Sequence, residues 1–296
     1  MNAYTMPLPD WGRCGVMGIV NVTPDSFSDG GLWLDPGKAV AHGLELVARG
    51  ADVVDVGGES TRPGAVRVTR EEELRRVLPV VRGLAEGGVL VSVDTMRADV
   101  AEAAVDAGAR IINDVSGGRA DDRMVSVAAR TGVPFVVMHW RGQSVGMDDL
   151  ASYGDVVGEV IDEVERQMDA VVSGGVDPAQ VIVDPGLGFA KTREDDWALL
   201  ARLDAWSRLG RPVLVAASRK RFLGTLLADP ATGEPRPARA RDAATAAVSA
   251  LAAAQGAWAV RVHEVPPTAD AVRVEAALRA ARGGSARGGS VRGGAE

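Results

Sequence analysis

Short apolar runs alternate with longer amphipathic stretches along most of this chain. Each run has the length of a β-strand, and nearly every run ends in a polar or glycine-rich cluster. The stretches between the runs are rich in Ala, Leu, Val, Glu and Arg, which is typical of helices. With their terminal clusters, the eight runs cover residues 15–31, 52–64, 89–95, 110–118, 135–142, 181–189, 213–220 and 258–265.

This alternation predicts an α/β fold, a single-domain (β/α)8 TIM barrel with parallel strands. The length of 296 residues would allow two average domains, but α/β barrels often use such a length as one. Active sites of these barrels lie at the C-terminal ends of the strands. The chain places its polar clusters at those ends, so we expect one functional site there.

The two ends of the chain are expected to lie outside the barrel. Residues 1–13 predict a short irregular N-terminal arm, and residues 14–281 predict the barrel itself. Residues 282–296 repeat Arg-Gly-Gly and have almost no apolar residues, so they predict a disordered tail. Such a tract can bind RNA, but a few copies in an acidic protein are weak evidence for that function.

Several helix boundaries can be predicted from local signals. Residues 34–51 have Pro36 near their start and Gly50 near their end, the usual asymmetry of a helix. Thr69 and Glu72 have capping-box spacing before the next helical stretch. The Ala-rich helix expected over 243–257 could be buried on several sides, as in a subunit interface, and we expect a homodimer.

Composition limits the classes of function. Hydrophobic residues make up 46% of the chain and aromatic residues only 4%, so the core must be mostly aliphatic. The net charge of −7 gives no overall attraction for nucleic acid or anionic membranes. We therefore expect small-molecule substrates, no nucleic acid and no membrane. An anionic substrate would need local Arg, Lys, His or a metal ion.

Cysteine content and the N-terminal sequence indicate a cytoplasmic protein. The single cysteine, Cys14, is expected to be a small buried hydrophobic residue, and it excludes a disulfide framework. The first residues have no apolar signal core, and no apolar segment approaches the ~18 residues of a membrane span.

The first polar cluster, residues 21–31, follows the first predicted strand. Asn21 and Asp25 offer hard oxygen ligands suited to Mg²⁺, an ion usually shared between a few protein groups, waters and a phosphate. The alternative is an Asx-turn followed by a solvated loop.

The second cluster, residues 55–64, has a double glycine that permits close backbone approach. Thr61 and Arg62 can bind an anion. The alternative is a tight turn with an exposed arginine, with Asp55 and Glu59 as structural carboxylates that orient neighbouring basic groups.

Three acceptors stand at or within apolar strands: Asp94, Asn113 and Asp184. A buried polar group is costly unless it is paired, and at the strand ends of a barrel these three could converge on one ligand. Their acceptor atoms fit a flat heterocycle with several N–H groups, such as a 2-aminopyrimidinone ring. Structural pairing with Arg or Lys is the alternative for any one of them.

Basic residues follow the last two strands. Ser218, Arg219, Lys220 and Arg221 form one cluster, and Arg261 and His263 are two positions apart, so they share a strand face. The loops after strands seven and eight often form a phosphate site. His139 is less persuasive as a site residue, and Met138 beside it is a candidate apolar wall. Nothing in the sequence marks a covalent nucleophile, a P-loop or a G-x-G-x-x-G motif.

In this order the motifs resemble those of the bacterial dihydropteroate synthases. The resemblance covers about residues 14–275 and rests on NVTPDSFSDGG, DVGGESTRPG, SVDT, INDVSGG, DPGLGF, SRK and RVH. Two departures affect the region of the second substrate's carboxylate. Ala216 stands where the family often has Gly, and Arg221 stands where some members have Ser.

The resemblance implies an enzyme that condenses 6-hydroxymethyl-7,8-dihydropterin diphosphate with 4-aminobenzoate. It implies a catalytic role for Asp94, Lys220, Asp25 and Asp29, the last two on the first loop. The implied binding residues are Asp94, Asn113, Asp184, Lys220 and Met138 for the pterin; Thr61, Arg261 and His263 for diphosphate; Phe27, Thr61, Arg62, Pro63 and Arg221 for aminobenzoate; and Asn21 for the cofactor Mg²⁺.

Departure of diphosphate would leave positive charge on the pterin methylene, which a carboxylate such as Asp94 would stabilise before the arylamine attacks. This dissociative path is favoured over direct displacement. Two other functions stay open: the pterin-binding barrel of a methyltetrahydrofolate methyltransferase, and a non-catalytic paralogue that only binds.

Overall fold

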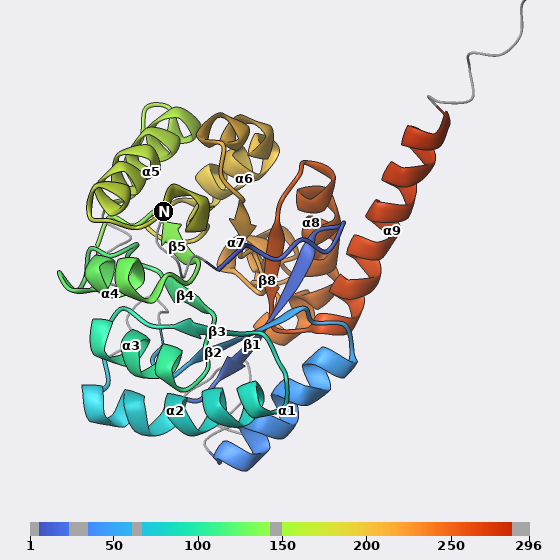
Figure 1. Cartoon of the computed structure of the whole chain (residues 1–296). Helices are drawn as coiled ribbons and strands as arrows, with labels where there is room; N and C mark the ends of the chain where they lie inside the picture. Colours follow the sequence, from blue (N-terminus) through green and yellow to red (C-terminus); the bar gives the residue numbers. More distant parts are fainter. Residues whose placement is uncertain (1–5, 24–34, 61–66, 143–149, 286–296) are drawn as a thin grey trace, which may run out of the picture.

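The computed structural model confirms the TIM barrel: eight strands form its inner wall and helices cover the outside (Figure 1). The main hydrophobic core lies between the strands and these helices. The structure describes residues 6–23, 35–60, 67–142 and 150–285. The strands are β1 (Gly15–Asn21), β2 (Val53–Gly57), β3 (Val91–Asp94), β4 (Ile111–Asp114), β5 (Phe135–Met138), β6 (Val181–Asp184), β7 (Leu214–Val215) and β8 (Ala259–Val262).

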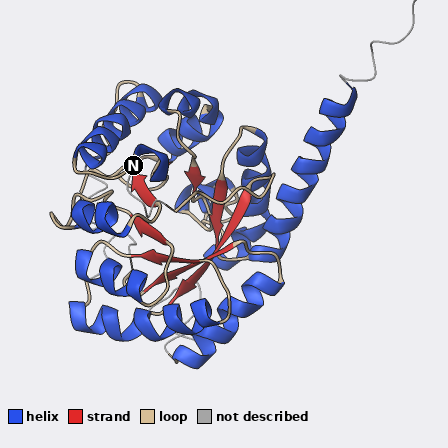
Figure 2. Ribbon diagram, viewed as in Figure 1, coloured by secondary structure: helices blue, strands red, loops and turns tan. Residues whose placement is uncertain are grey.

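The strands pair in parallel in the order β6-β5-β4-β3-β2-β1-β8-β7. A bridge between Val183 and Val213 joins the two ends of this order, and the Val183 amide donates to the Pro212 carbonyl at 2.9 Å. The sheet therefore curls round on itself, with the helices outside it (Figure 2).

Each strand is followed by helical structure, as a βα repeat requires. The α-helices are α1 (Pro36–Ala48), α2 (Arg70–Glu86), α3 (Ala98–Asp106), α4 (Met124–Thr131), α5 (Val156–Ser173), α6 (Arg193–Ala201), α7 (Arg221–Leu226), α8 (Asp242–Ala254) and α9 (Val265–Ser285). Short 3-10 helices lie at Pro178–Gln180 (η2), Leu203–Leu209 (η3) and Ala238–Arg241 (η4).

Inside the barrel, an apolar layer lies below polar ones. The lower layer consists of Met17, Val53, Ile111, Val136, Ile182, Leu214 and Ala259, which form a cluster of their own. Two residues further along four of these strands, where side chains return to the same face, stand the polar residues Asp55, Asn113, Asp184 and Arg261. The carboxylates that interrupt the apolar runs are therefore interior residues of the upper barrel.

The predicted N-terminal arm covers the lower layer. Leu8 and Trp11 pack against the apolar cluster together with Trp258. The rings of Trp11 and Trp258 lie 5.3 Å apart, and the Trp258 indole N–H donates to the Pro9 carbonyl at 3.0 Å. These contacts cover the end of the barrel opposite the C-terminal strand ends.

Helix caps agree with the sequence signals in part. Thr69 caps α2 by accepting from the Glu72 amide at 3.2 Å. The Glu72 carboxylate bonds Arg75 and Arg76 instead of completing the predicted capping box. A complete box occurs at Thr192 and Asp195, at the start of α6.

The C-terminal helix α9 runs to Ser285, so the boundary expected at residue 281 falls within its last turns. It extends outward from the barrel (Figure 1), and the rest of the predicted tail lies outside the described residues. No helix in the described ranges is both long enough and apolar enough to cross a membrane.

The arm contacts predict that Trp11→Ala lowers the free energy of unfolding by about 2 kcal/mol, because a partly buried ring over the apolar layer is lost. Catalytic constants should stay unchanged, since the arm and the strand ends lie at opposite ends of the barrel. Chemical denaturation with parallel steady-state assays checks this, with Trp11→Phe as the control that keeps a ring. A loss of activity without a loss of stability would contradict this role of the arm.

Candidate active site

Strand register brings the predicted polar residues together at one rim. Asn21 pairs with Gly57, Gly57 with Asp94, and Asp94 with Asn113 across four neighbouring strands. Met138 at the end of β5 is paired with Asp184 at the end of β6. Residues paired in a parallel sheet point to the same side, so these side chains share the upper interior.

Arg261 on β8 binds two of the carboxylates across the barrel. Its Nε donates to Asp55 Oδ2 at 2.6 Å and its Nη2 to Asp94 Oδ2 at 2.7 Å. Asn113 Nδ2 also donates to Asp55 Oδ2, at 3.1 Å. Sequence suggested that Asp55 orients a basic group, and the structure confirms this.

The second oxygens of both carboxylates, Asp55 Oδ1 and Asp94 Oδ1, are buried and have no hydrogen-bond partner among the described residues. Burial raises the pKa of Asp94 to about 7, although the Arg261 charge opposes the shift. Burial also works against the charge of Arg261, but Asp55 and Asp94 outweigh it and raise its pKa. In the cluster of Arg261, Asp55 and Asp94, two carboxylate oxygens are therefore still available to accept hydrogen bonds from a ligand.

Asp184 and Lys220 are two further buried ionisable groups at the same rim, and they interact electrostatically. Asp184 Oδ1 accepts from the Gly186 amide at 2.7 Å, and burial raises the pKa of this carboxyl. Lys220 donates to the Leu187 carbonyl, and burial lowers its pKa to about 8 while Asp184 opposes that shift. Asp184, Lys220 and Arg261 therefore influence one another electrostatically.

His263, just after β8, is oriented by Ser218 from the loop after β7. The Ser218 hydroxyl oxygen lies 2.9 Å from His263 Nδ1 and accepts from the His263 amide at 3.1 Å. A hydroxyl has one hydrogen and two lone pairs, so Ser218 accepts the His263 amide hydrogen and also has a group for Nδ1. The two contacts together fix the orientation of the imidazole ring.

The neighbouring residues of this loop have different roles. Arg219 has a left-handed backbone (φ 59°) and pairs with Asp242 through two bonds of 2.7 and 2.8 Å. Arg221 is exposed in the first turn of α7.

Met138, the candidate apolar wall, lies in an apolar environment beside the rim. It is buried in a small cluster with Met96 and Val115, against which Phe189 and Trp140 pack. The Phe189 ring also lies 4.9 Å from Lys220 Nζ. A flat ring bound by the polar residues at the strand ends would contact this apolar cluster.

Six predicted site residues lie outside the described residues: Asp25, Phe27, Asp29, Thr61, Arg62 and Pro63. Their assignments stay predictions.

Sequence reasoning missed a buried lysine beside the site. Lys191 Nζ lies 2.8 Å from His139 Nδ1, and His139 Nε2 lies 2.9 Å from Glu163 Oε2. His139 is thus part of a buried chain of hydrogen bonds. The only sequence feature that could have indicated this role is the position of Lys191, a charged residue shortly after the DPGLGF motif.

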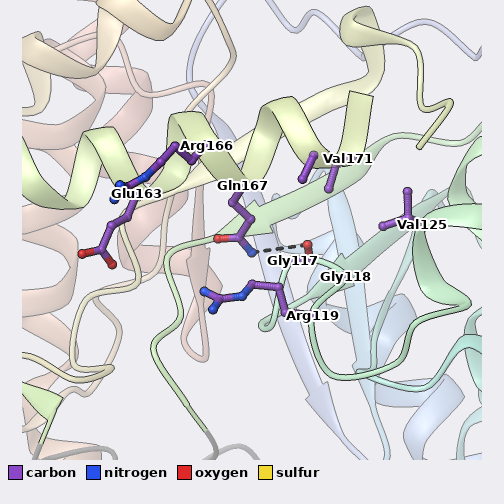
Figure 3. A pocket seen from close by; sticks show the side chains of 9 residues that line it. Gly117, Gly118, Arg119, Val125, Glu163, Arg166, Gln167 and Val171 are labelled. Carbon is purple, nitrogen blue, oxygen red and sulfur yellow. Dashed lines mark hydrogen bonds between the residues drawn. The ribbon is translucent and has the colours of Figure 1, made fainter. Parts of the chain in front are cut away.

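A cavity of about 450 Å³ lies away from the rim, between α5 and the segment after β4 (Figure 3). Gln167 crosses its inner side and donates to the Ser116 carbonyl at 2.7 Å. Glu163, Arg119 and Arg166 also line it. None of the residues predicted for the site contributes to this cavity.

The environment of His139 predicts a pH effect on stability. Burial, followed by the Lys191 charge, lowers the pKa of His139 from 6.5 to about 4. The unfolded chain therefore takes up a proton near pH 6.5 while the folded chain does not. The stability contributed by neutral His139 is complete above pH 6.5 and is lost as the pH falls to about 4, by on the order of 3 kcal/mol.

His139→Gln keeps an acceptor for Lys191 and a donor for Glu163 but cannot titrate. Its free energy of unfolding should fall less than that of the wild type between pH 6.5 and 4. Titrating groups that do not contact residue 139 are common to both proteins and cancel in the comparison, and His139→Gln keeps a donor for Glu163. Parallel stability curves from urea denaturation would contradict a neutral native His139.

Comparison with known proteins agrees with this geometry. The family model described as pterin binding enzyme matches residues 17–263. The dihydropteroate synthase of Mycobacterium leprae is 55% identical over 260 residues, which cover 88% of this chain and 91% of that protein.

Solved structures of synthases from Xanthomonas albilineans are similar as well. One with 4-aminobenzoic acid has a TM-score of 0.82 at 46% identity, covering 90% of this chain and 94% of the other. One with 7,8-dihydropteroate has a TM-score of 0.79 at 43% identity, with the same coverage. These similarities confirm the predicted resemblance and favour the synthases over the methyltransferase barrels. The chain therefore belongs to the pterin binding enzymes and, within that family, to the dihydropteroate synthases.

Proposed function

We propose that this synthase joins 6-hydroxymethyl-7,8-dihydropterin diphosphate to 4-aminobenzoate by a dissociative substitution assisted by Mg²⁺. It is a transferase of alkyl or aryl groups other than methyl, and its products are 7,8-dihydropteroate and diphosphate. The observation that carries the proposal is the placement of Arg261. It binds the carboxylates of Asp55 and Asp94 inside the upper barrel, and it stands on β8, close to the basic residues that follow β7 and β8.

The pterin ring would bind among Asp94, Asn113, Asp184 and Lys220. Its aminopyrimidinone edge presents N–H donors, and the carboxylates of Asp94 and Asp184 are buried acceptors. Lys220 supplies a donor for the ring carbonyl or a ring nitrogen. Met138 and Phe189 would contact the face of the ring, since both belong to the apolar wall.

The diphosphate would bind at Arg261 and His263. Both stand on the same end of the barrel, and Ser218 already orients the imidazole. The guanidinium charge and an imidazole N–H would stabilise the charge that develops on a departing diphosphate. Thr61, outside the described residues, is the third predicted ligand.

Asn21 is the proposed protein ligand of Mg²⁺. It ends β1 at the rim, and its amide oxygen is a hard donor. No group of three His, Cys, Asp or Glu in the described part of the chain could hold a metal ion. This donor set fits an ion that is shared with diphosphate oxygens and waters. When bound, Mg²⁺ would supply further positive charge to the leaving group.

We propose that the C–O bond to diphosphate breaks before the new C–N bond forms. The positive charge left on the pterin methylene spreads into the ring, and Asp94 would stabilise it through its carboxylate, whose Oδ1 has no hydrogen-bond partner among the described residues. The arylamine nitrogen then attacks the methylene, and the proton that it loses passes to the departed diphosphate. Arg221, at the start of α7, would attract the aminobenzoate carboxylate from the rim.

Homodimer formation and a cytoplasmic location stay proposals. Leu226 on α7 and Leu251 on α8 are 61% and 64% exposed, which gives a dimer a candidate apolar surface.

Diphosphate release tests the function directly. The purified chain with Mg²⁺ should release diphosphate in a coupled assay only when both the pterin diphosphate and 4-aminobenzoate are present, and dihydropteroate should form in equal amount. Release at the same rate without 4-aminobenzoate would make the chain a hydrolase instead.

In the same assay, Asp184→Asn should lower kcat/KM by roughly 30- to 1,000-fold, because a ring N–H would face an amide donor in place of an acceptor (about 2–4 kcal/mol). Asp177→Asn, at the half-buried cap of η2 near the other end of β6, is the matched control and should change little. Near-normal efficiency of Asp184→Asn would exclude Asp184 from the ring site.

A further inference from the structure

The segment that joins β6 to α6 has an unusual backbone and lies directly under the proposed pterin site. Gly186, Gly188 and Ala190 have positive φ angles of 65°, 72° and 47°. An alanine in this region is strained, so surrounding contacts must hold it there. Residues 185–190 are called the β6–α6 loop below.

This loop forms part of the pterin site through its backbone. Its Gly186 amide donates to Asp184 Oδ1 at 2.7 Å, which fixes the carboxylate. Its Leu187 carbonyl accepts from Lys220, which fixes the ammonium. The shape of the loop therefore decides where the two charged groups of the ring site point.

Lys191 holds the loop from the buried side. Its side chain is 5% exposed, and Nζ donates to the carbonyls of Gly186 and Phe189, both at 3.0 Å. The third ammonium hydrogen goes to His139 Nδ1 at 2.8 Å. An ammonium has three donors, and here each has an acceptor, two of them in the loop.

His139 is fixed in turn from α5 and the segment after β5. Because Nδ1 accepts from Lys191, Nε2 carries the proton and donates to Glu163 Oε2 at 2.9 Å. Arg141 binds both oxygens of Glu163, at 3.1 and 2.6 Å. The guanidinium also lies 3.9 Å from the centre of the Tyr153 ring.

Tyr153 also binds the β6–α6 loop: its hydroxyl donates to the carbonyl of the strained Ala190 at 2.8 Å. The backbone carbonyls of Gly186, Phe189 and Ala190 are thus all held by Lys191 or Tyr153.

We propose that Lys191 is a positioning residue for pterin recognition, and that His139, Glu163, Arg141 and Tyr153 fix it in place. This inference rests on the proposed function, because it assigns the ring to Asp184 and Lys220. Without the ammonium, buried carbonyls lose their donors and the loop relaxes from its left-handed conformation. Asp184 and Lys220 then lose their orientation, whereas Arg261 on β8 keeps its own partners.

The test is calorimetry with two probes, 6-hydroxymethylpterin for the ring site and inorganic diphosphate with Mg²⁺ for the anion site. Lys191→Met should weaken binding of the pterin at least tenfold and change binding of diphosphate less than twofold. Tyr153→Phe removes one hydrogen bond to the same loop and should weaken pterin binding two- to fivefold. It remains informative if Lys191→Met does not fold.

The matched control is Gln180→Met. Gln180 is also buried and donates to a backbone carbonyl, that of Gly132, but near the opposite end of β6. It should lower stability and leave pterin affinity unchanged.

Unchanged pterin binding in both loop variants, equal losses for the two probes, or the same selective loss in Gln180→Met would overturn the role of Lys191. Failure of the wild type to bind 6-hydroxymethylpterin would instead contradict the proposed function.

Discussion

A guanidinium enclosed by an apolar barrel requires carboxylates beside it, and this constraint shapes the upper half of the structure. Arg261 stands on β8, two residues after Ala259 of the apolar layer. Burying its charge without a partner would cost many kcal/mol, so Asp55 and Asp94 must come from the strands that face it. The strands β3, β2, β1 and β8 are consecutive in the sheet, and its curvature brings the side chains of β8, β2 and β3 to one point inside the barrel.

Two carboxylates around one guanidinium leave an excess of negative charge. Burial is the largest cause that raises the pKa of Asp94 to about 7; repulsion from Asp55 adds to it, while the Arg261 charge opposes it. A substrate that develops positive charge on its ring would relieve the same repulsion. The cluster of Arg261, Asp55 and Asp94 can therefore present a guanidinium to the leaving anion and a carboxylate to the cation that forms beside it. A dissociative transfer needs both.

The second half of the site is fixed by hydrogen bonds to backbone carbonyls. Asp184 and Lys220 depend on the β6–α6 loop, and that loop depends on Lys191 below it. Groups that are already oriented cost little free energy when a ligand binds. Hydrogen bonds within the protein orient the charged groups in both halves of the site.

Much of this arrangement could be predicted from the sequence. The order of apolar runs gave the barrel, and single polar residues in strands, such as Asp94 and Asp184, were identified because an unpaired polar group in an apolar run needs a partner. The chain from Lys191 to Glu163 could not be predicted, since its acceptors are backbone carbonyls in left-handed conformations that have no sequence periodicity. The capping box at Glu72 does not form, because Arg75 and Arg76 compete for its carboxylate. The end of α9 lies beyond Ala281, although the glycine-rich sequence there predicts no helix.

The central claim is that Arg261, held by Asp55 and Asp94, receives the diphosphate. Arg261→Lys keeps the charge that the two carboxylates require but loses the planar fork. By calorimetry it should weaken binding of the pterin diphosphate at least tenfold more than binding of the pterin without diphosphate. Equal losses for the two ligands would show that Arg261 serves the ring or the fold, and would contradict this account of the site.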